Sequence, residues 1–199
     1  TCDCIDRMRR QGMLTLLDKN KLPAFVNLDP FLLNREYDPH NNYSIPLMWG
    51  ITGIFFNQNH YAPHAITRWA DLWGPQFKNQ ILLLDDPRDV FAIAFRTLGY
   101  SINDSNPEHI KQAYLKLKTL LPNIKTFNNA VATAAIDEDV TIGMSWNVDL
   151  LKAKQENSQL AFTFPQDGFL IWVDTIAIPK NAPHLTNAYK FLNFRLRPD

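Results

Sequence analysis

Residues 46–56 read PLMWGITGIFF, an apolar run interrupted by two glycines, and this pattern predicts one long strand. Residues 169–178 read FLIWVDTIAI and predict a second long strand. Both runs are longer than a buried strand usually needs, so we expect each strand to cross between two lobes. Gly50 and Gly53 would ease a bend in the first crossing.

Shorter strands and helical patterns alternate around these two runs. Residues 81–84 and 140–145 predict buried strands. Pro107 opens a helix that Pro122 stops, and the last helix has an apolar face made of Leu185, Ala188, Tyr189, Leu192 and Leu196. Thr67 is expected to cap a short helix that runs to Trp73 and ends at Gly74. This alternation predicts an α/β fold.

The sequence DDPRD, residues 85–89, stands where a strand ends and a helix begins. Asp86 is a good helix N-cap, Pro87 suits the first helical position, and Asp89 falls at the capping-box position. Taken alone, the pattern favours capping over ligand binding. The two roles are compatible, because ligands of open α/β sheets bind beyond the carboxyl ends of strands, and capping leaves Asp85 or Asp89 free to face a cleft.

Tryptophans mark the other candidate positions. Trp172 and Asp174 alternate along one strand and therefore share a face, which favours a binding role over a buried structural aspartate. Trp146 ends a predicted strand, where core packing and cleft lining are equally compatible with its position. Trp49 is expected to pack, and Trp69 and Trp73, four residues apart, are most simply core residues. Indole rings beside carboxylates suit an organic cation, which gains a charge partner and a cation–π contact.

Composition and motifs exclude several functional classes. Lys and Arg total 20, as do Asp and Glu, and this balance argues against nucleic acid or an anionic membrane as partner. Cys2 and Cys4 are too few for a closed zinc site, and Pro63 makes a shared helical face for His60 and His64 improbable, so no metal site is predicted. No apolar run approaches the length of a membrane span. Since no nucleophile elbow or phosphate loop occurs, we expect a cofactor-free binding protein and not an enzyme.

The chain resembles the spermidine/putrescine-binding proteins of bacterial polyamine ABC importers along its full length and in the same order. The segments that carry this resemblance are residues 6–13 (DRMRRQGM), 25–30 (FVNLDP), 43–50 (YSIPLMWG), 69–73 (WADLW), 84–90 (LDDPRDV), 98–100 (LGY), 142–147 (IGMSWN), 172–179 (WVDTIAIP) and 194–199 (FRLRPD).

The resemblance implies which residues contact the ligand. The family's binding carboxylates fall on Asp86, Asp89 and Asp174, with Asp89 in place of a Glu that is one methylene longer, and its aromatic walls fall on Trp146 and Trp172. Asn129 falls near a polar contact of the family, although the alignment slips by one residue there. Asp3 stands where the family carries an aromatic wall residue, so that position gains a charge or loses a stacking contact.

The resemblance also implies the fold, the partners and the cellular location. It implies a two-lobed periplasmic-binding-protein-like α/β fold with hinge crossovers, in which residues 51–173 form the second lobe and residues 1–50 and 174–199 form parts of an incomplete first lobe. The expected function is to bind a polyamine between closing lobes, as a periplasmic monomer, and to deliver it to an ABC-type permease in the inner membrane. Two alternatives remain open from the residues: a carbohydrate-active enzyme that uses paired carboxylates and Trp platforms, and a polyamine sensor.

Overall fold

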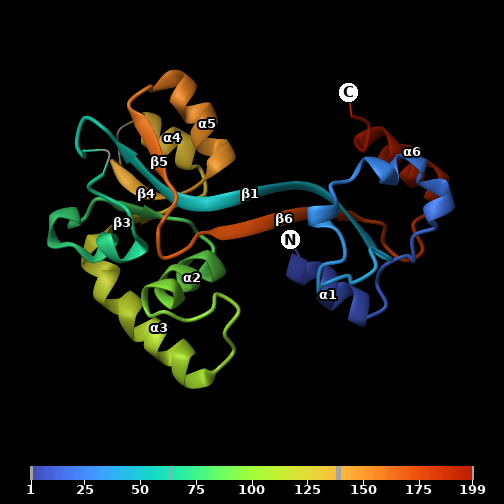
Figure 1. Cartoon of the computed structure of the whole chain (residues 1–199), viewed down its shortest axis with the longest axis horizontal. Helices are drawn as coiled ribbons and strands as arrows, with labels where there is room; N and C mark the ends of the chain where they lie inside the picture. Colours follow the sequence, from blue (N-terminus) through green and yellow to red (C-terminus); the bar gives the residue numbers. More distant parts are fainter. Residues whose placement is uncertain (1, 63, 138–139, 199) are drawn as a thin grey trace. The chain divides into compact units, whose positions relative to one another are not determined.

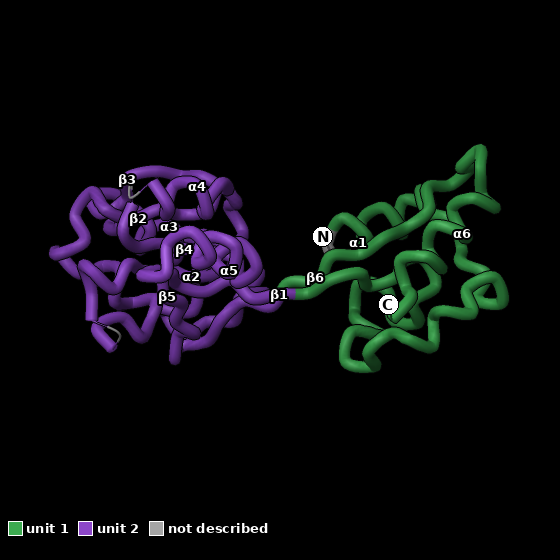
Figure 2. The backbone as a smooth tube through the Cα atoms, turned by 90° about the horizontal axis from the view of Figure 1, so that it is seen from above, with its two compact units in different colours: residues 1–49, 172–199 green, residues 50–171 purple. Residues whose placement is uncertain are grey.

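The chain divides into two compact units (Figure 2). The computed structural model describes residues 2–62, 64–137 and 140–198, without the side chains of Cys2 and Asp3. Unit 1 comprises residues 1–49 and 172–199, and unit 2 comprises residues 50–171. The lobes predicted from the sequence place the two boundaries at residues 50 and 173, one and two residues later than the boundaries of these units.

Unit 2 is organised by a mixed sheet whose six strands include β1 and β6, and both of these strands run on into unit 1 (Figure 1). The strand order is β3-β2-β4-β1-β5, and β6 pairs with β1. β2 is parallel to both β3 and β4, whereas β1 is antiparallel to both β4 and β5. The strand bounds are β1 Ser44–Asn57, β2 Ile81–Leu83, β3 Ile124–Phe127, β4 Ile142–Trp146, β5 Leu160–Thr163 and β6 Leu170–Ala177.

The core of unit 2 follows from the apolar runs seen in the sequence. Ile54 of β1 pairs with Met144 of β4, and Phe56 pairs with Ile142. All four side chains are buried, as is every residue of β2, because helices cover the sheet. Each fully buried side chain of this size contributes about 1.5–3 kcal/mol, so these strands hold the unit together.

Helices of unit 2 begin where the sequence supplies caps. Asp86 accepts a hydrogen bond from Arg88 N at 2.8 Å and caps α2, and Asn106 accepts one from Glu108 N at 3.0 Å and caps α3. α2 and α3 pack against each other through Phe95 and Ala113 (Figure 1). The bounds are α2 Pro87–Thr97, α3 Pro107–Leu120, α4 Val131–Ile136 and α5 Asn147–Glu156.

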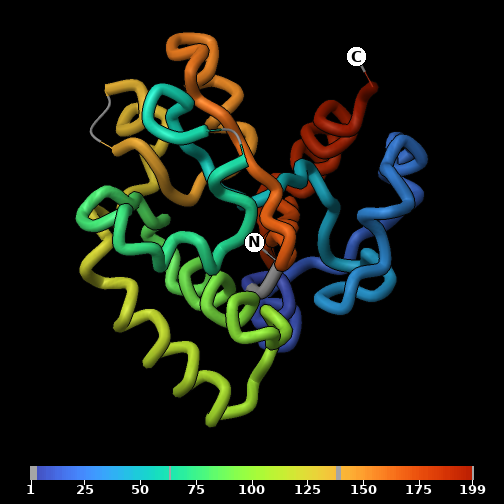
Figure 3. The backbone as a smooth tube through the Cα atoms, turned by 60° about the vertical axis from the view of Figure 1, so that its left-hand side comes forward, coloured from blue at the N-terminus to red at the C-terminus, as the bar shows by residue number. Residues whose placement is uncertain are grey.

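Unit 1 is built from an early and a late segment of the chain, which are blue and red in Figure 3. It contains α1 (Cys2–Arg10) and α6 (Leu185–Arg195), and Thr15 N donates to Ile178 O at 2.8 Å across the unit. Tyr189 of α6 is buried with Leu22 and Ile45 in a small separate core. The early and late segments therefore stabilise each other.

Buried Asp38 organises the approach to β1 in unit 1. Its carboxylate accepts hydrogen bonds from the backbone N–H groups of Asn42, Tyr43 and Ser44 and from the Ser44 hydroxyl, at 2.8 to 3.0 Å. Four donors satisfy a buried charge that would otherwise be costly. The start of β1 is thus fixed by a side chain outside the strand.

Two local predictions are wrong. The expected short helix does end at Trp73 before Gly74, but it is a 3-10 helix, Trp69–Trp73, and its N-cap is Arg68 and not Thr67. The Asp71 carboxylate accepts hydrogen bonds from Thr67 N and Arg68 N, which turns the chain later than expected. Trp49 does not pack into a core, since 44% of its surface is exposed, and its ring lies 6.2 Å from the ring of Phe31. Among the described residues, no helix combines the length and apolarity that a bilayer crossing requires.

Candidate functional site

An acidic turn follows β2 in unit 2 and leads into α2. Leu84 is buried, Asp85 is exposed, and Asp86 and Asp89 are partly exposed at the first turn of the helix. The helix dipole favours anionic side chains at this position. The turn therefore presents carboxylates to solvent at the carboxyl end of a central strand, as the sequence predicted.

Asp89 sits among groups that act on its charge in opposite directions. Burial and the neighbouring carboxylate of Asp86 raise the pKa of Asp89, while hydrogen bonds from Thr52 and Trp146 lower it, and the net shift is upward. The Thr52 hydroxyl lies 3.3 Å from Asp89 Oδ2. Asp89 is consequently a carboxylate whose ionised form gains from any further cation placed beside it.

Thr52 and Trp146 reach Asp89 from two paired strands. Thr52 of β1 lies directly opposite Trp146 of β4 in the antiparallel register. Trp146 is only partly buried and packs against the core of unit 2, which is the first of the two roles that the sequence left open. Thr52 itself was missed by sequence reasoning. The sequence feature that could have indicated Thr52 is a hydroxyl side chain inside an otherwise apolar run.

Asn129 lies beside the same acidic turn. Its Oδ1 accepts from Asp85 N at 2.9 Å, and its Nδ2 donates to Asp85 O at 3.4 Å. This reciprocal pairing ties the loop after β3 to the loop after β2. The structure thus brings Asn129 close to Asp86 and Asp89 and engages its amide with the backbone.

Trp172 and Asp174 belong to unit 1, where β6 enters it. Both are partly exposed and lie two residues apart in the strand, so their side chains share a face. The indole N–H of Trp172 has no hydrogen-bond partner among the residues that the structure describes. This indole nitrogen is itself buried, so the unpaired donor is a cost that the fold of unit 1 carries.

Asp3, the remaining predicted site residue, has a side chain that lies outside the described part of the structure. Metal ligation has no support in the described ranges, where no group of three or more His, Cys, Asp or Glu side chains could hold an ion. His60 and His64 are both exposed.

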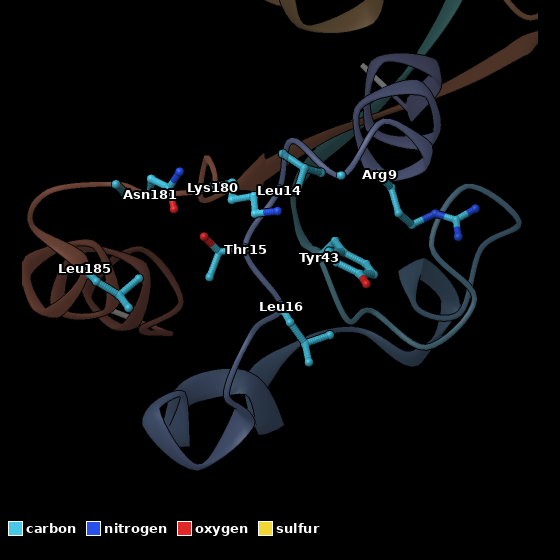
Figure 4. Close-up of a pocket in the computed structure, with 10 residues that line it drawn as sticks. Arg9, Leu14, Thr15, Leu16, Tyr43, Lys180, Asn181 and Leu185 are labelled. Carbon is cyan, nitrogen blue, oxygen red and sulfur yellow. The ribbon is translucent and has the colours of Figure 1, made fainter.

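A cavity of about 550 Å³ in unit 1 contains none of the predicted site residues (Figure 4). Arg9 and Lys180 supply its charged groups, and Tyr43, Thr15 and Leu185 supply part of the remaining wall. Arg9 is already bound to Asp6 at 2.8 Å and to Tyr37 O at 3.1 Å. Because no carboxylate is among the residues that line this cavity, it offers an amine no charge partner, and the acidic turn of unit 2 is the better candidate site.

Comparisons with known proteins agree with the predicted resemblance. The spermidine/putrescine-binding periplasmic protein of Salmonella typhimurium is 45% identical over 98% of this chain. The spermidine/putrescine ABC transporter substrate-binding protein PotD of Streptococcus pneumoniae superposes with a TM-score of 0.84 at 33% identity, and the TpPotD lipoprotein of Treponema pallidum with 0.91 at 26% identity.

The matched regions cover nearly all of this chain but only part of each relative. The chain spans 56% of the Salmonella protein, and its structural matches span 98% and 99% of this chain but 60% and 63% of the two solved chains. These superpositions confirm the predicted α/β fold of the periplasmic-binding-protein type.

The family model described as bacterial extracellular solute-binding protein matches residues 3–199. This agrees with the prediction that the chain is not an enzyme. The chain belongs to the bacterial extracellular solute-binding protein family.

Proposed function

We propose that this chain binds a polyamine of the spermidine and putrescine type in the periplasm and delivers it to an ABC-type permease of the inner membrane. The observation that carries the proposal is the acidic turn of unit 2, in which Asp86 and Asp89 stand beside Trp146. Relatives that are named as spermidine/putrescine-binding proteins share this chain's sequence over nearly its whole length.

The chemistry of the two sets of residues fits a linear chain of ammonium groups. Asp86 and Asp89 of unit 2 bind one ammonium group through charge-assisted hydrogen bonds, and Trp146 covers adjoining methylenes. Trp172 and Asp174 of unit 1 bind a separate ammonium group in the same way. Domain closure, as in other binding proteins, removes water and strengthens each contact.

The proposal also specifies the oligomeric state and the number of ligands bound. Each chain acts as a monomer, takes one amine, and needs no cofactor or metal. A polyamine is a small cation, so local carboxylates suffice to hold it in a protein with balanced formal charge.

Calorimetry with a panel of ligands tests this function. We expect putrescine or spermidine to bind with one-to-one stoichiometry and a neutral disaccharide to give no heat of binding. Asp86→Asn should weaken amine binding by at least about 2 kcal/mol, as is typical when one partner of a close charge pair is removed. The proposed function is wrong if no amine binds, or if the sugar binds and is hydrolysed.

A further inference from the structure

Thr52 is a polar residue that the apolar stretch of β1 does not need for packing. It is fully buried, between Ile51 and Gly53 and two residues before the core residue Ile54. A buried hydroxyl without a partner costs about 1–3 kcal/mol, so its hydrogen bond to Asp89 matters for the fold as well as for Asp89.

The surroundings of Asp89 show what this hydroxyl contributes. Burial is the largest effect that raises the pKa of Asp89, and the carboxylate of Asp86, the N-cap of α2, adds to it. The two neighbouring strands offset this through neutral donors, Thr52 from β1 and the indole of Trp146 from β4. The hydrogen bonds from the two strands thus oppose part of the effect of burial and of Asp86 on the Asp89 carboxylate.

We propose that Thr52 is a positioning residue for amine binding, whose buried hydroxyl donates to Asp89 Oδ2 and fixes the direction of that carboxylate. This inference rests on the proposed function, because it assigns Asp89 the role of receiving an ammonium group. Thr52 itself is buried behind Asp89 and touches no ligand in this assignment.

Thr52→Val tests the hydroxyl with little change in side-chain shape. Removing a donor to the charged form raises the pKa of a carboxyl group further, so Asp89 in this variant should titrate at higher pH than in the parent chain. Thr52→Ser keeps the hydroxyl and should restore the parent behaviour. Thr141→Val is the matched control, because the Thr141 hydroxyl lies 3.1 Å from the Tyr61 hydroxyl in the same unit and bonds to no carboxylate within the described ranges.

The first measurement needs no ligand. Carbon-detected NMR of the Asp carboxyl carbons, recorded against pH on the whole 199-residue chain, follows the titration midpoint of Asp89 in the parent and in the three variants. We expect the midpoint to move up in Thr52→Val alone. An unchanged midpoint in Thr52→Val, or an equal shift in Thr141→Val, overturns the inference, whereas a merely structural role would lower the melting temperature and leave the midpoint in place.

The second measurement adds spermidine and follows its affinity by calorimetry as pH rises from 4 to 8. Loss of a hydrogen bond to a charged group is expected to weaken binding about tenfold in Thr52→Val, most strongly at low pH. Thr52→Ser and Thr141→Val should match the parent. If the parent chain binds no amine while the NMR shift occurs, the proposed function fails but the control of Asp89 by Thr52 stands. If amine binds equally to all four chains, the positioning role fails and the function stands.

Discussion

At the scale of single residues, Asp89 links folding to binding through one carboxylate. Burial raises its pKa above the ordinary value of 3.8, and Asp86 adds to that effect. The folded chain therefore keeps a proton on Asp89 at pH values where the unfolded chain has lost it. Stability from this group is present below the ordinary pKa and is lost as pH rises through the raised one. At neutral pH the ionised carboxylate therefore destabilises the free protein, and a bound cation would offset that cost.

Asp89→Asn should raise the stability of the free protein and weaken amine binding. At pH 7 we expect a higher melting temperature than in the parent chain, together with about 2–5 kcal/mol weaker amine binding, because the ammonium group loses its charge partner. The stability difference should shrink as pH falls below the raised pKa. Thermal unfolding between pH 3 and 7 measures it, with Asp85→Asn, an exposed neighbour, as control. A stability difference that does not depend on pH would contradict the role of burial.

Trp172 and Asp174 provide a second residue-scale prediction in unit 1. Asp174→Asn should cost about 2–5 kcal/mol of amine affinity. Trp172→Ala should cost about 1–2 kcal/mol, since a cation–π contact and an apolar contact are lost. Calorimetry measures both, and spermidine-induced fluorescence quenching should diminish in Trp172→Ala. Unchanged dissociation constants would remove these residues from the site.

The residues of the site were predictable to different degrees. Asp86 and Asp89 stand out because cap chemistry and an acidic cluster coincide at one strand end. Asn129 could only be placed by resemblance, since its partners are the backbone atoms of Asp85, 44 residues away along the chain. Thr52 could not be predicted, because a single hydroxyl in a strand does not reveal which carboxylate lies across the sheet.

At the scale of elements, the length of a helix or strand determined whether the sequence could predict it. The two long apolar runs correspond to β1 and β6, and α3 and α6 lie where proline and apolar periodicity predict them. β3, β5 and α4 were not predicted. They have four to six residues each, and α4 begins without a side-chain cap. Local sequence patterns are too weak to specify elements this short, so packing against the rest of the unit determines whether they form.

Gly143 carries a prediction about the sheet. It lies in β4 beside β2, and a Cβ atom added there would collide with the Leu82 carbonyl oxygen and the Leu82 Cβ. Gly143→Ala should therefore destabilise unit 2 by about 1–3 kcal/mol, as is usual for overpacking in a core. Urea unfolding followed by circular dichroism tests this. A variant as stable as the parent would mean that β2 and β4 can separate at this point without cost.

At the scale of the whole molecule, two compact units share one chain that passes between them in β1 and β6. Each unit has its own core, and each carries a carboxylate beside a partly exposed tryptophan. Long strands with glycine were sufficient to predict two lobes, whereas their arrangement depends on contacts between distant segments that local patterns do not contain.

A crystal structure of the chain grown with spermidine tests amine binding at the acidic turn most directly. We predict ligand density with a nitrogen about 2.7–2.9 Å from a carboxylate oxygen of Asp86 or Asp89 and with methylenes against Trp146. Spermidine bound instead in the cavity lined by Arg9, Tyr43 and Lys180, or no spermidine density at saturating concentration, would contradict the proposed site.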